Sequence, residues 1–159
     1  MINSGGMAEQ LAGQLLRSVT PGYVPPLLYY WQRGKKGSEA EIDYVIQHEH
    51  QIIPIEVKAG TTGSLKSLHQ FMKEKRKMLA VRINSDVPSL ASIDLKDSLG
   101  SSIQYTLLSL PFYLLSQIHR LINSSTARKG DFVQRLRTGK TRDYLNRSSL
   151  QKKSDSDDD

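Results

Sequence analysis

Cysteine is absent from this sequence of 159 residues, and no long uninterrupted hydrophobic run is present. Without cysteine the chain forms no disulfide framework and no thiolate metal site, so any metal must be held by oxygen or imidazole ligands. The longest apolar stretch, 103–122, contains glutamine, histidine and arginine, which argues against a transmembrane helix. The first ten residues lack the basic and then apolar pattern of a signal peptide. We therefore expect a cytoplasmic protein that does not enter a membrane.

Apolar residues are also sparse, at 38% of the chain. This share is enough for one modest core. From residue 124 onward large apolar residues are few, Arg, Lys and Ser are frequent, and the chain ends in SDSDDD. We expect one domain over 1–123 and a disordered basic tail with an acidic end over 124–159. The net charge of +6 suits a nucleic-acid partner, but a surplus of this size is weak evidence for one.

Hydrophobic periodicity predicts an alternation of helices and strands within 1–123. The expected helices cover 7–17, about 64–77 with Ser64 as N-cap, and 109–121. The expected strands cover 27–32, 41–46, 52–59, 79–83 and 103–108, and the stretch 86–102 is expected to be a loop. The predicted fold is α/β, a three-layer core in which helices flank a central mixed sheet whose first three strands form a meander.

The predicted hairpin over 41–60 carries acidic residues and one lysine at alternating positions. Glu56 and Lys58 project from the same face of the second strand. Asp43 on the first strand joins them only if the turn holds two or four residues, because a slip of one residue inverts a strand. The link QHEHQ has no signature that fixes the register. Alternation is expected to place one apolar set together on the first strand, namely Ile42, Tyr44 and Ile46.

Two carboxylates beside a lysine suit a hard cation, Mg²⁺ with Mn²⁺ as a substitute, whose remaining positions hold water and a phosphate. In such a site the metal activates the water, and Lys58 orients the water or neutralises the developing charge. The plainer interpretation is that Asp43, Glu56 and Lys58 form the solvated face of an amphipathic hairpin. Cross-strand ion pairs of that kind contribute less than about 1 kcal/mol each.

The stretches YYWQRGKKGSEAEIDYVI and IIPIEVKAGTTGSLKSLHQFM resemble a nuclease-like domain of unknown function. That domain follows the AAA+ ATPase module in a large family of prokaryotic ATPases and belongs to the PD-(D/E)XK, restriction-endonuclease-like fold group. The resemblance covers residues 1 to about 122. It implies that Asp43 and Glu56 bind metal with Glu9 of the first helix, and that Lys58 completes the catalytic set. Gln70 is a weaker candidate for contacting substrate or a metal-bound water.

No ATPase module precedes the domain in this sequence. The resemblance therefore implies an isolated or truncated copy, incomplete at its N-terminus, with an ATPase as a candidate partner. Two functional hypotheses stay open. One is magnesium-dependent hydrolysis of DNA phosphodiester bonds. The other is a non-catalytic domain that binds nucleic acid or protein for an AAA+ ATPase, or an inactive remnant of one.

Other basic and aromatic residues near the hairpin have two interpretations each. Lys35 and Lys36 lie next to an aromatic run, 29–31, and this mixture can bind single strands, although alternation favours packing for most of the rings. The lysines and arginine of 73–77 suit either a phosphate backbone or the dipole at a helix C-terminus. His48 and His50 in the hairpin link are expected to be solvated.

Overall fold

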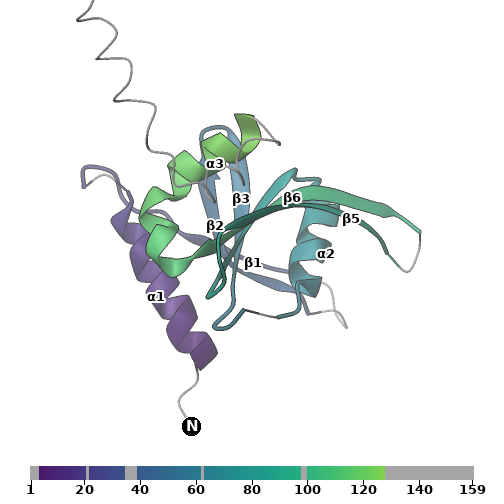
Figure 1. The fold of residues 1–159 in the computed structure, drawn as a ribbon, viewed down its shortest axis with the longest axis horizontal. Helices are drawn as coiled ribbons and strands as arrows, with labels where there is room; N and C mark the ends of the chain where they lie inside the picture. The colour runs from purple at the N-terminus through teal and green to yellow at the C-terminus, as the bar shows by residue number, and fades with distance from the viewer. Residues whose placement is uncertain (1–3, 21, 35–38, 62, 98–99, 128–159) are drawn as a thin grey trace, which may run out of the picture.

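The computed structural model describes residues 4–20, 22–34, 39–61, 63–97 and 100–127 (Figure 1). The elements are, in chain order, α1 (Ser4–Ser18), β1 (Tyr29–Gln32), β2 (Glu41–His48), β3 (Gln51–Val57), α2 (Lys66–Lys75), β4 (Leu79–Asn84), β5 (Ser89–Lys96), β6 (Ser102–Pro111), the 3-10 helix η1 (Phe112–Gln117) and α3 (Ile118–Ala127). The tail expected over 124–159 lies outside the described residues from 128 onward.

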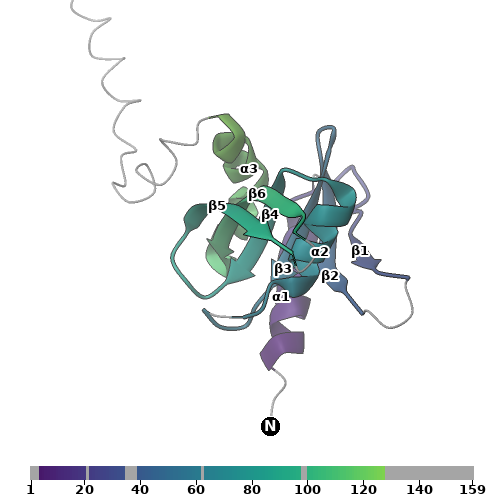
Figure 2. The same cartoon turned by 90° about the vertical axis from the view of Figure 1, so that its right-hand side faces the viewer.

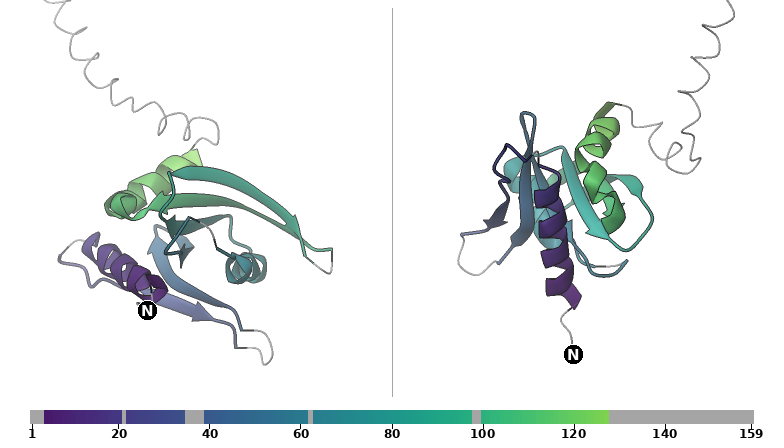
Figure 3. Two further views of the ribbon diagram at one scale, coloured as in Figure 1. Left: turned by 60° about the horizontal axis from the view of Figure 1, so that its bottom comes forward. Right: turned by 90° about the vertical axis from the view of Figure 1, so that its left-hand side faces the viewer.

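The strands form one mixed sheet in the order β1-β2-β3-β4-β6-β5. β1, β2 and β3 are a consecutive antiparallel meander, β3 and β6 each pair with β4 in parallel, and β5 pairs antiparallel to β6. Helix α2 covers one face, and α1, η1 and α3 cover the other, as Figures 1 and 3 show. The expected three-layer α/β architecture is confirmed.

The sheet has an apolar core on each face. On the α1 side, Ala12 and Leu16 of α1 and Ile118 of α3 pack over the central strands. On the α2 side, Leu68 and Phe71 cover the other face. Burial of both faces explains why β4 reads as a nearly continuous apolar run, LAVRIN, instead of an alternating one. Within the described residues, no helix has the length and apolar character needed to span a bilayer.

The stretch expected to be a loop, 86–102, contains a strand of eight residues, β5. β5 is an edge strand with a mostly exposed or half-buried pattern, and it pairs along its whole length with β6 (Figure 2). Its polar sequence SLASIDLK gives little hydrophobic signal, so this segment was predicted to be a loop. The prediction is wrong because backbone pairing with β6 makes the segment a strand. At the C-terminal side, the expected helix begins as a 3-10 turn after Pro111 and continues as α3.

The turn of the β2–β3 hairpin holds two residues, Glu49 and His50, and His48 pairs with Gln51 across it. Glu49 has a φ of 53°, the positive φ that tight hairpin turns require. A two-residue turn is one of the even lengths that the candidate site needs. The sequence therefore folds into a register that pairs Tyr44 with Ile55, the residues next to Asp43 and Glu56.

A bulge in β2 changes the expected alternation next to the site. Tyr29 of β1 pairs with Val45, whereas Trp31 pairs with Ile42, so β2 has one extra residue over this interval. Ile42 is consequently buried on the α2 side, while Tyr44 packs on the α1 side. The expectation that Ile42 and Tyr44 share a face is wrong, because the extra residue reverses the alternation between them.

His48 is buried, contrary to the expectation of a solvated histidine, whereas His50 is exposed. The hairpin tip lies against α3, where Nε2 of His48 is 2.6 Å from Oδ1 of Asn123 and its Nδ1 is 2.7 Å from Nδ1 of His119. The amide oxygen only accepts, so His48 carries its proton on Nε2 and His119 donates from Nδ1. These contacts attach the hairpin to α3, and a pairing of residues so distant in sequence has no local signal.

Gly13 on α1 gives a testable contact between α1 and the hairpin. A Cβ at this position would lie 2.5 Å from the hydroxyl oxygen of Tyr44. Alanine normally stabilises a helix interior by about 1 kcal/mol over glycine, but overpacking costs roughly 1–3 kcal/mol. We expect Gly13→Ala to lower the melting temperature. Thermal denaturation checks this, and the double variant with Tyr44→Phe should recover part of the loss; a gain in stability from Gly13→Ala alone would contradict the packing.

Candidate functional site

The two candidate carboxylates of the hairpin, Asp43 and Glu56, lie near the end of the β2–β3 ladder away from the turn. The last pair of this ladder joins Tyr44 to Ile55, and the chain continues to Asp43 on β2 and to Glu56 on β3. Beyond that pair the backbone N–H of Val57 donates to Oδ2 of Asp43, at 2.6 Å. The side chain of Asp43 therefore takes a backbone hydrogen bond at this end of the hairpin, and its carboxylate is fixed in place.

Glu56 is the most buried of the site carboxylates, with 5% of its surface exposed. Its Oε1 accepts a hydrogen bond from Nζ of Lys58 at 2.6 Å. Its Oε2 is buried without a hydrogen-bond partner among the described residues. Burial raises the pKa of Glu56, the bond from Lys58 opposes that rise, and the charge of Asp43 adds to it. Glu56 thus has one hydrogen-bonded oxygen and one buried oxygen with no hydrogen-bond partner among the described residues.

The pKa of Asp43 is also raised above its ordinary value. Burial raises its pKa, the hydrogen bond from Val57 and the charge of Lys58 lower it, and the charge of Glu41 raises it. The net direction is upward although a backbone donor and a lysine both favour the charged form. A negative cluster of this kind is stabilised by an added positive charge.

Glu9 reaches the cluster from α1. Its backbone carbonyl accepts a hydrogen bond from the hydroxyl of Tyr44 at 2.9 Å, which ties this turn of α1 to β2. Its side chain is exposed, and its pKa is raised by partial burial and then by the charges of Asp43 and Glu41, against a lowering by Lys58. The carboxylate expected from the first helix therefore lies within electrostatic range of the hairpin site.

Lys58 follows the last residue of β3, and its backbone N–H donates to the carbonyl of Ile83 at 2.8 Å. A Cβ at Gly63 would lie 2.7 Å from Cδ of Lys58. The absence of a side chain at Gly63 leaves the space in which the lysine turns back toward Glu56. This glycine is a positioning residue that sequence reasoning missed.

Three other expected residues are not brought into the cluster by the described contacts. Gln70 of α2 donates its amide to Oε1 of Glu74 at 2.7 Å, along its own helix. Lys35 and Lys36 lie outside the described residues.

Two further residues belong to the surroundings of the site and were not predicted. Tyr44 was expected only as core, yet it holds Glu9 as described above. Asn84 ends β4, next to Ile83, and is fully buried with both polar side-chain atoms unpaired among the described residues. The parallel ladder of β3 and β4 ends at the pair Val57–Ile83, so Asn84 follows directly after the last paired residue of β4. A polar residue at the end of an apolar strand was the available signal for Asn84.

The donor set fits a hard divalent cation, although the carboxylates are not drawn together around one point. Across the described ranges, no three histidine, aspartate or glutamate side chains are close enough to form a ready metal site. The unpaired buried Oε2 of Glu56 and the raised pKa values of Glu56, Asp43 and Glu9 are the features that a cation would relieve. All of these ligand atoms are oxygens, which Mg²⁺ and Mn²⁺ prefer.

A protein-family model, the domain of unknown function DUF4143, matches residues 4–98. The matched segment runs from the start of α1 through β5 and includes all four candidate residues, Glu9, Asp43, Glu56 and Lys58. No curated protein and no solved structure matches the chain.

Proposed function

The chain belongs to the DUF4143 family, whose function is unknown, and from its site we propose that it is a PD-(D/E)XK-type, restriction-endonuclease-like hydrolase that cuts DNA phosphodiester bonds with Mg²⁺. The observation that carries the proposal is Glu56. It is a buried carboxylate with one oxygen paired to Lys58 and the other without a hydrogen-bond partner in the described part of the chain, within electrostatic range of Asp43. A carboxylate of a purely structural ion pair has no need of a second, unpaired buried oxygen.

Each residue of the site has a distinct task in this proposal. Glu56 and Asp43 hold the cation, and Glu9 approaches from α1 as a third ligand. The cation, when bound, lowers the pKa of a water and offsets charge on the scissile phosphate. Lys58 then has its ammonium next to the metal-binding carboxylate, where it orients the attacking water or stabilises negative charge that develops on the phosphate.

The competing function is a non-catalytic interaction domain, with an AAA+ ATPase as its candidate partner. One observation favours it: the described carboxylates do not converge on a metal position as they stand. In that case the ion pair of Glu56 and Lys58 stabilises the hairpin end and nothing more. The two functions differ in whether the carboxylates respond to a divalent cation.

The test is cleavage of plasmid and branched DNA by the purified chain, with Mg²⁺ or Mn²⁺ and with chelator, beside a Lys58→Ala variant. We expect metal-dependent cleavage that Lys58→Ala reduces by roughly a hundredfold, the effect of losing one positioned electrostatic group. Lys96→Ala on β5, which removes the same charge at the far edge of the sheet, should cut normally. Absence of cutting under every condition would refute the enzymatic proposal.

A further inference from the structure

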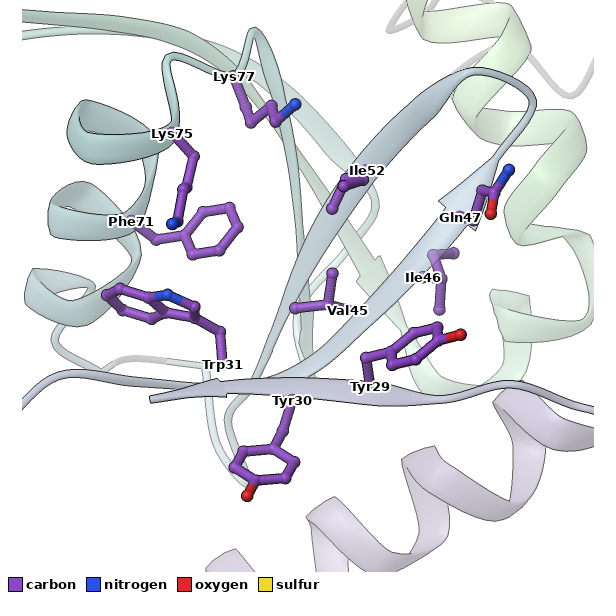
Figure 4. Close-up of a pocket in the computed structure, with 10 residues that line it drawn as sticks. All are labelled: Tyr29, Tyr30, Trp31, Val45, Ile46, Gln47, Ile52, Phe71, Lys75 and Lys77. Atoms are coloured by element: carbon purple, nitrogen blue, oxygen red, sulfur yellow. The ribbon is translucent and has the colours of Figure 1, made fainter. Parts of the chain in front are cut away.

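An open groove of about 540 Å³ lies between α2 and the β1–β2–β3 meander (Figure 4). Its size is within the range of pockets that bind small flat groups, roughly 300–1,000 Å³. The groove is lined by aromatic and aliphatic side chains of the meander and by Phe71, Lys75 and Lys77 of the α2 side. The acidic cluster is not part of its lining.

Two of the apolar side chains that line the groove are largely exposed to solvent. Tyr29 is 54% exposed and Ile52 is 46% exposed. Trp31 forms a firmer wall, since its ring meets Phe71 edge to face with the centroids 5.1 Å apart. Figure 4 shows the rings of Tyr29 and Trp31 on the groove side of β1. Flat rings held on a strand are what stacking ligands require.

The charge of the groove is positive. Lys75 is exposed and ends α2, and Lys77 follows two residues later. Figure 4 shows Lys75 next to the ring of Phe71 and Lys77 farther along the same wall of the groove. The dipole at the C-terminus of α2 accounts for cations at this end, and both lysines line the groove together with the aromatic side chains. Rings and cations together select a ligand with flat apolar groups and negative charge.

The groove and the candidate site lie on neighbouring stretches of the same two strands, β2 and β3. Trp31 pairs with Ile42, the residue just before Asp43, and Tyr29 pairs with Val45 farther toward the turn. A substrate strand that ran from the site along β2 would therefore pass Trp31 first and Tyr29 next. A substrate strand bound at the site could therefore extend into the groove.

We propose that this groove binds an unpaired, single-stranded segment of the nucleic-acid substrate, with bases stacked on Trp31 and Tyr29 and phosphates against Lys75 and Lys77. The inference rests on the proposed function for the choice of nucleic acid as ligand. It adds a substrate class: strands with an unpaired stretch beside the scissile phosphate bind better than continuous duplex.

The test uses the full chain in chelator, so that binding is measured without cutting. Trp31 is the only tryptophan of the chain, and its fluorescence reports stacking directly. The probes are a 20-mer of thymidylate, a 20-mer of uridylate and a 20-base-pair duplex. We expect quenching by the single strands, with DNA and RNA compared in separate arms, and at least tenfold weaker binding of the duplex.

Variants that retain Trp31 as the fluorescent reporter identify which residues of the groove contact the strand. Tyr29→Ala should weaken single-strand binding about tenfold, the scale of one lost base–aromatic stack. Lys75→Ala and Lys77→Ala should each reduce the salt dependence, by about 0.7 in the slope of log affinity against log salt. The matched controls are Tyr113→Ala, an exposed tyrosine of η1, and Lys96→Ala of β5, which should bind as the wild type does.

Three results would overturn the groove proposal: no quenching by either single strand, equal affinity for duplex, or Tyr29→Ala binding as tightly as Tyr113→Ala. Self-association that Tyr29→Ala abolishes, without oligonucleotide binding, would assign the groove to a second copy of the chain instead. The outcome is separable from that of the nuclease proposal. Binding by an Asp43→Asn chain that never cuts supports the groove alone, whereas cutting that the groove variants leave unchanged supports the nuclease alone.

Discussion

Replacing Asp43 by asparagine should reduce magnesium-dependent DNA cleavage by about a thousandfold, because loss of a metal ligand removes several kcal/mol of transition-state stabilisation. The variant should still fold. The asparagine carbonyl oxygen can accept the hydrogen bond that Val57 donates to Asp43, so the end of the hairpin keeps its backbone contact. The substitution removes the negative charge of the side chain. Cleavage rates at saturating Mg²⁺, with circular dichroism of the same samples, measure both consequences.

The control is Asp94→Asn on β5, which makes the same chemical change at the opposite edge of the sheet, where Asp94 accepts a hydrogen bond from Gln104. It should cut at the wild-type rate. Cleavage that survives Asp43→Asn but disappears with chelator would move the metal to other ligands. Cleavage that survives both would point to a contaminating nuclease.

Replacing Glu56 by glutamine should stabilise the metal-free protein while it abolishes cleavage. The fold raises the pKa of Glu56 chiefly by burying it, so the charged form is less favourable in the folded chain than in the unfolded chain and costs stability at neutral pH. Glutamine resembles the neutral form. In chelator at pH 7.5 we expect a melting temperature higher by about 4 °C, which corresponds to roughly 1 kcal/mol in a domain of this size.

The pH dependence gives the sign of this effect. A carboxyl whose folded pKa lies above its unfolded value contributes stability at low pH, and the contribution is lost as pH rises from 4.5 through the folded pKa. The advantage of Glu56→Gln should therefore be absent near pH 4, grow above it and then stay constant. Melting curves of both proteins from pH 4 to pH 8 test this, since groups that do not interact with Glu56 contribute equally to both curves.

Glu74→Gln is the opposite-sign control. The pKa of Glu74 is lowered, chiefly by the hydrogen bond from Gln70, so folding favours its charged form and glutamine should cost a little stability above pH 4.5.

Binding of Mg²⁺ gives a second comparison between the wild type and Glu56→Gln. At a hundred times its Kd, a cation stabilises the wild type by about 2.7 kcal/mol, and Glu56→Gln should lose most of that gain. A Mg²⁺-induced rise in melting temperature that is identical in both proteins would exclude Glu56 as a ligand.

The helices and strands that the sequence predicted correctly are those with a strong hydrophobic pattern. The strands 41–46 and 79–83 and the helix expected over about 64–77 were found because their apolar periodicity is strong. That helix is α2, Lys66–Lys75, and the expected N-cap Ser64 is wrong because the N-cap is Leu65, with no side-chain capping bond. The edge strand β5 was missed because its SLASIDLK sequence has no buried face to mark it. His48 was misassigned because its partners, His119 and Asn123, are more than 70 residues away.

The sequence by itself determined the α/β class, the meander and the residues of the candidate site, since alternation puts Glu56 and Lys58 together and local patterns define the strands. Only the tertiary structure decided the hairpin register, the bulge beside Asp43, the approach of Glu9 and the groove next to Trp31. These features arise where segments distant in sequence meet. Their geometry depends on which side chains pack between them, as Tyr44 packs against Gly13, and periodicity within one segment carries no information about the other.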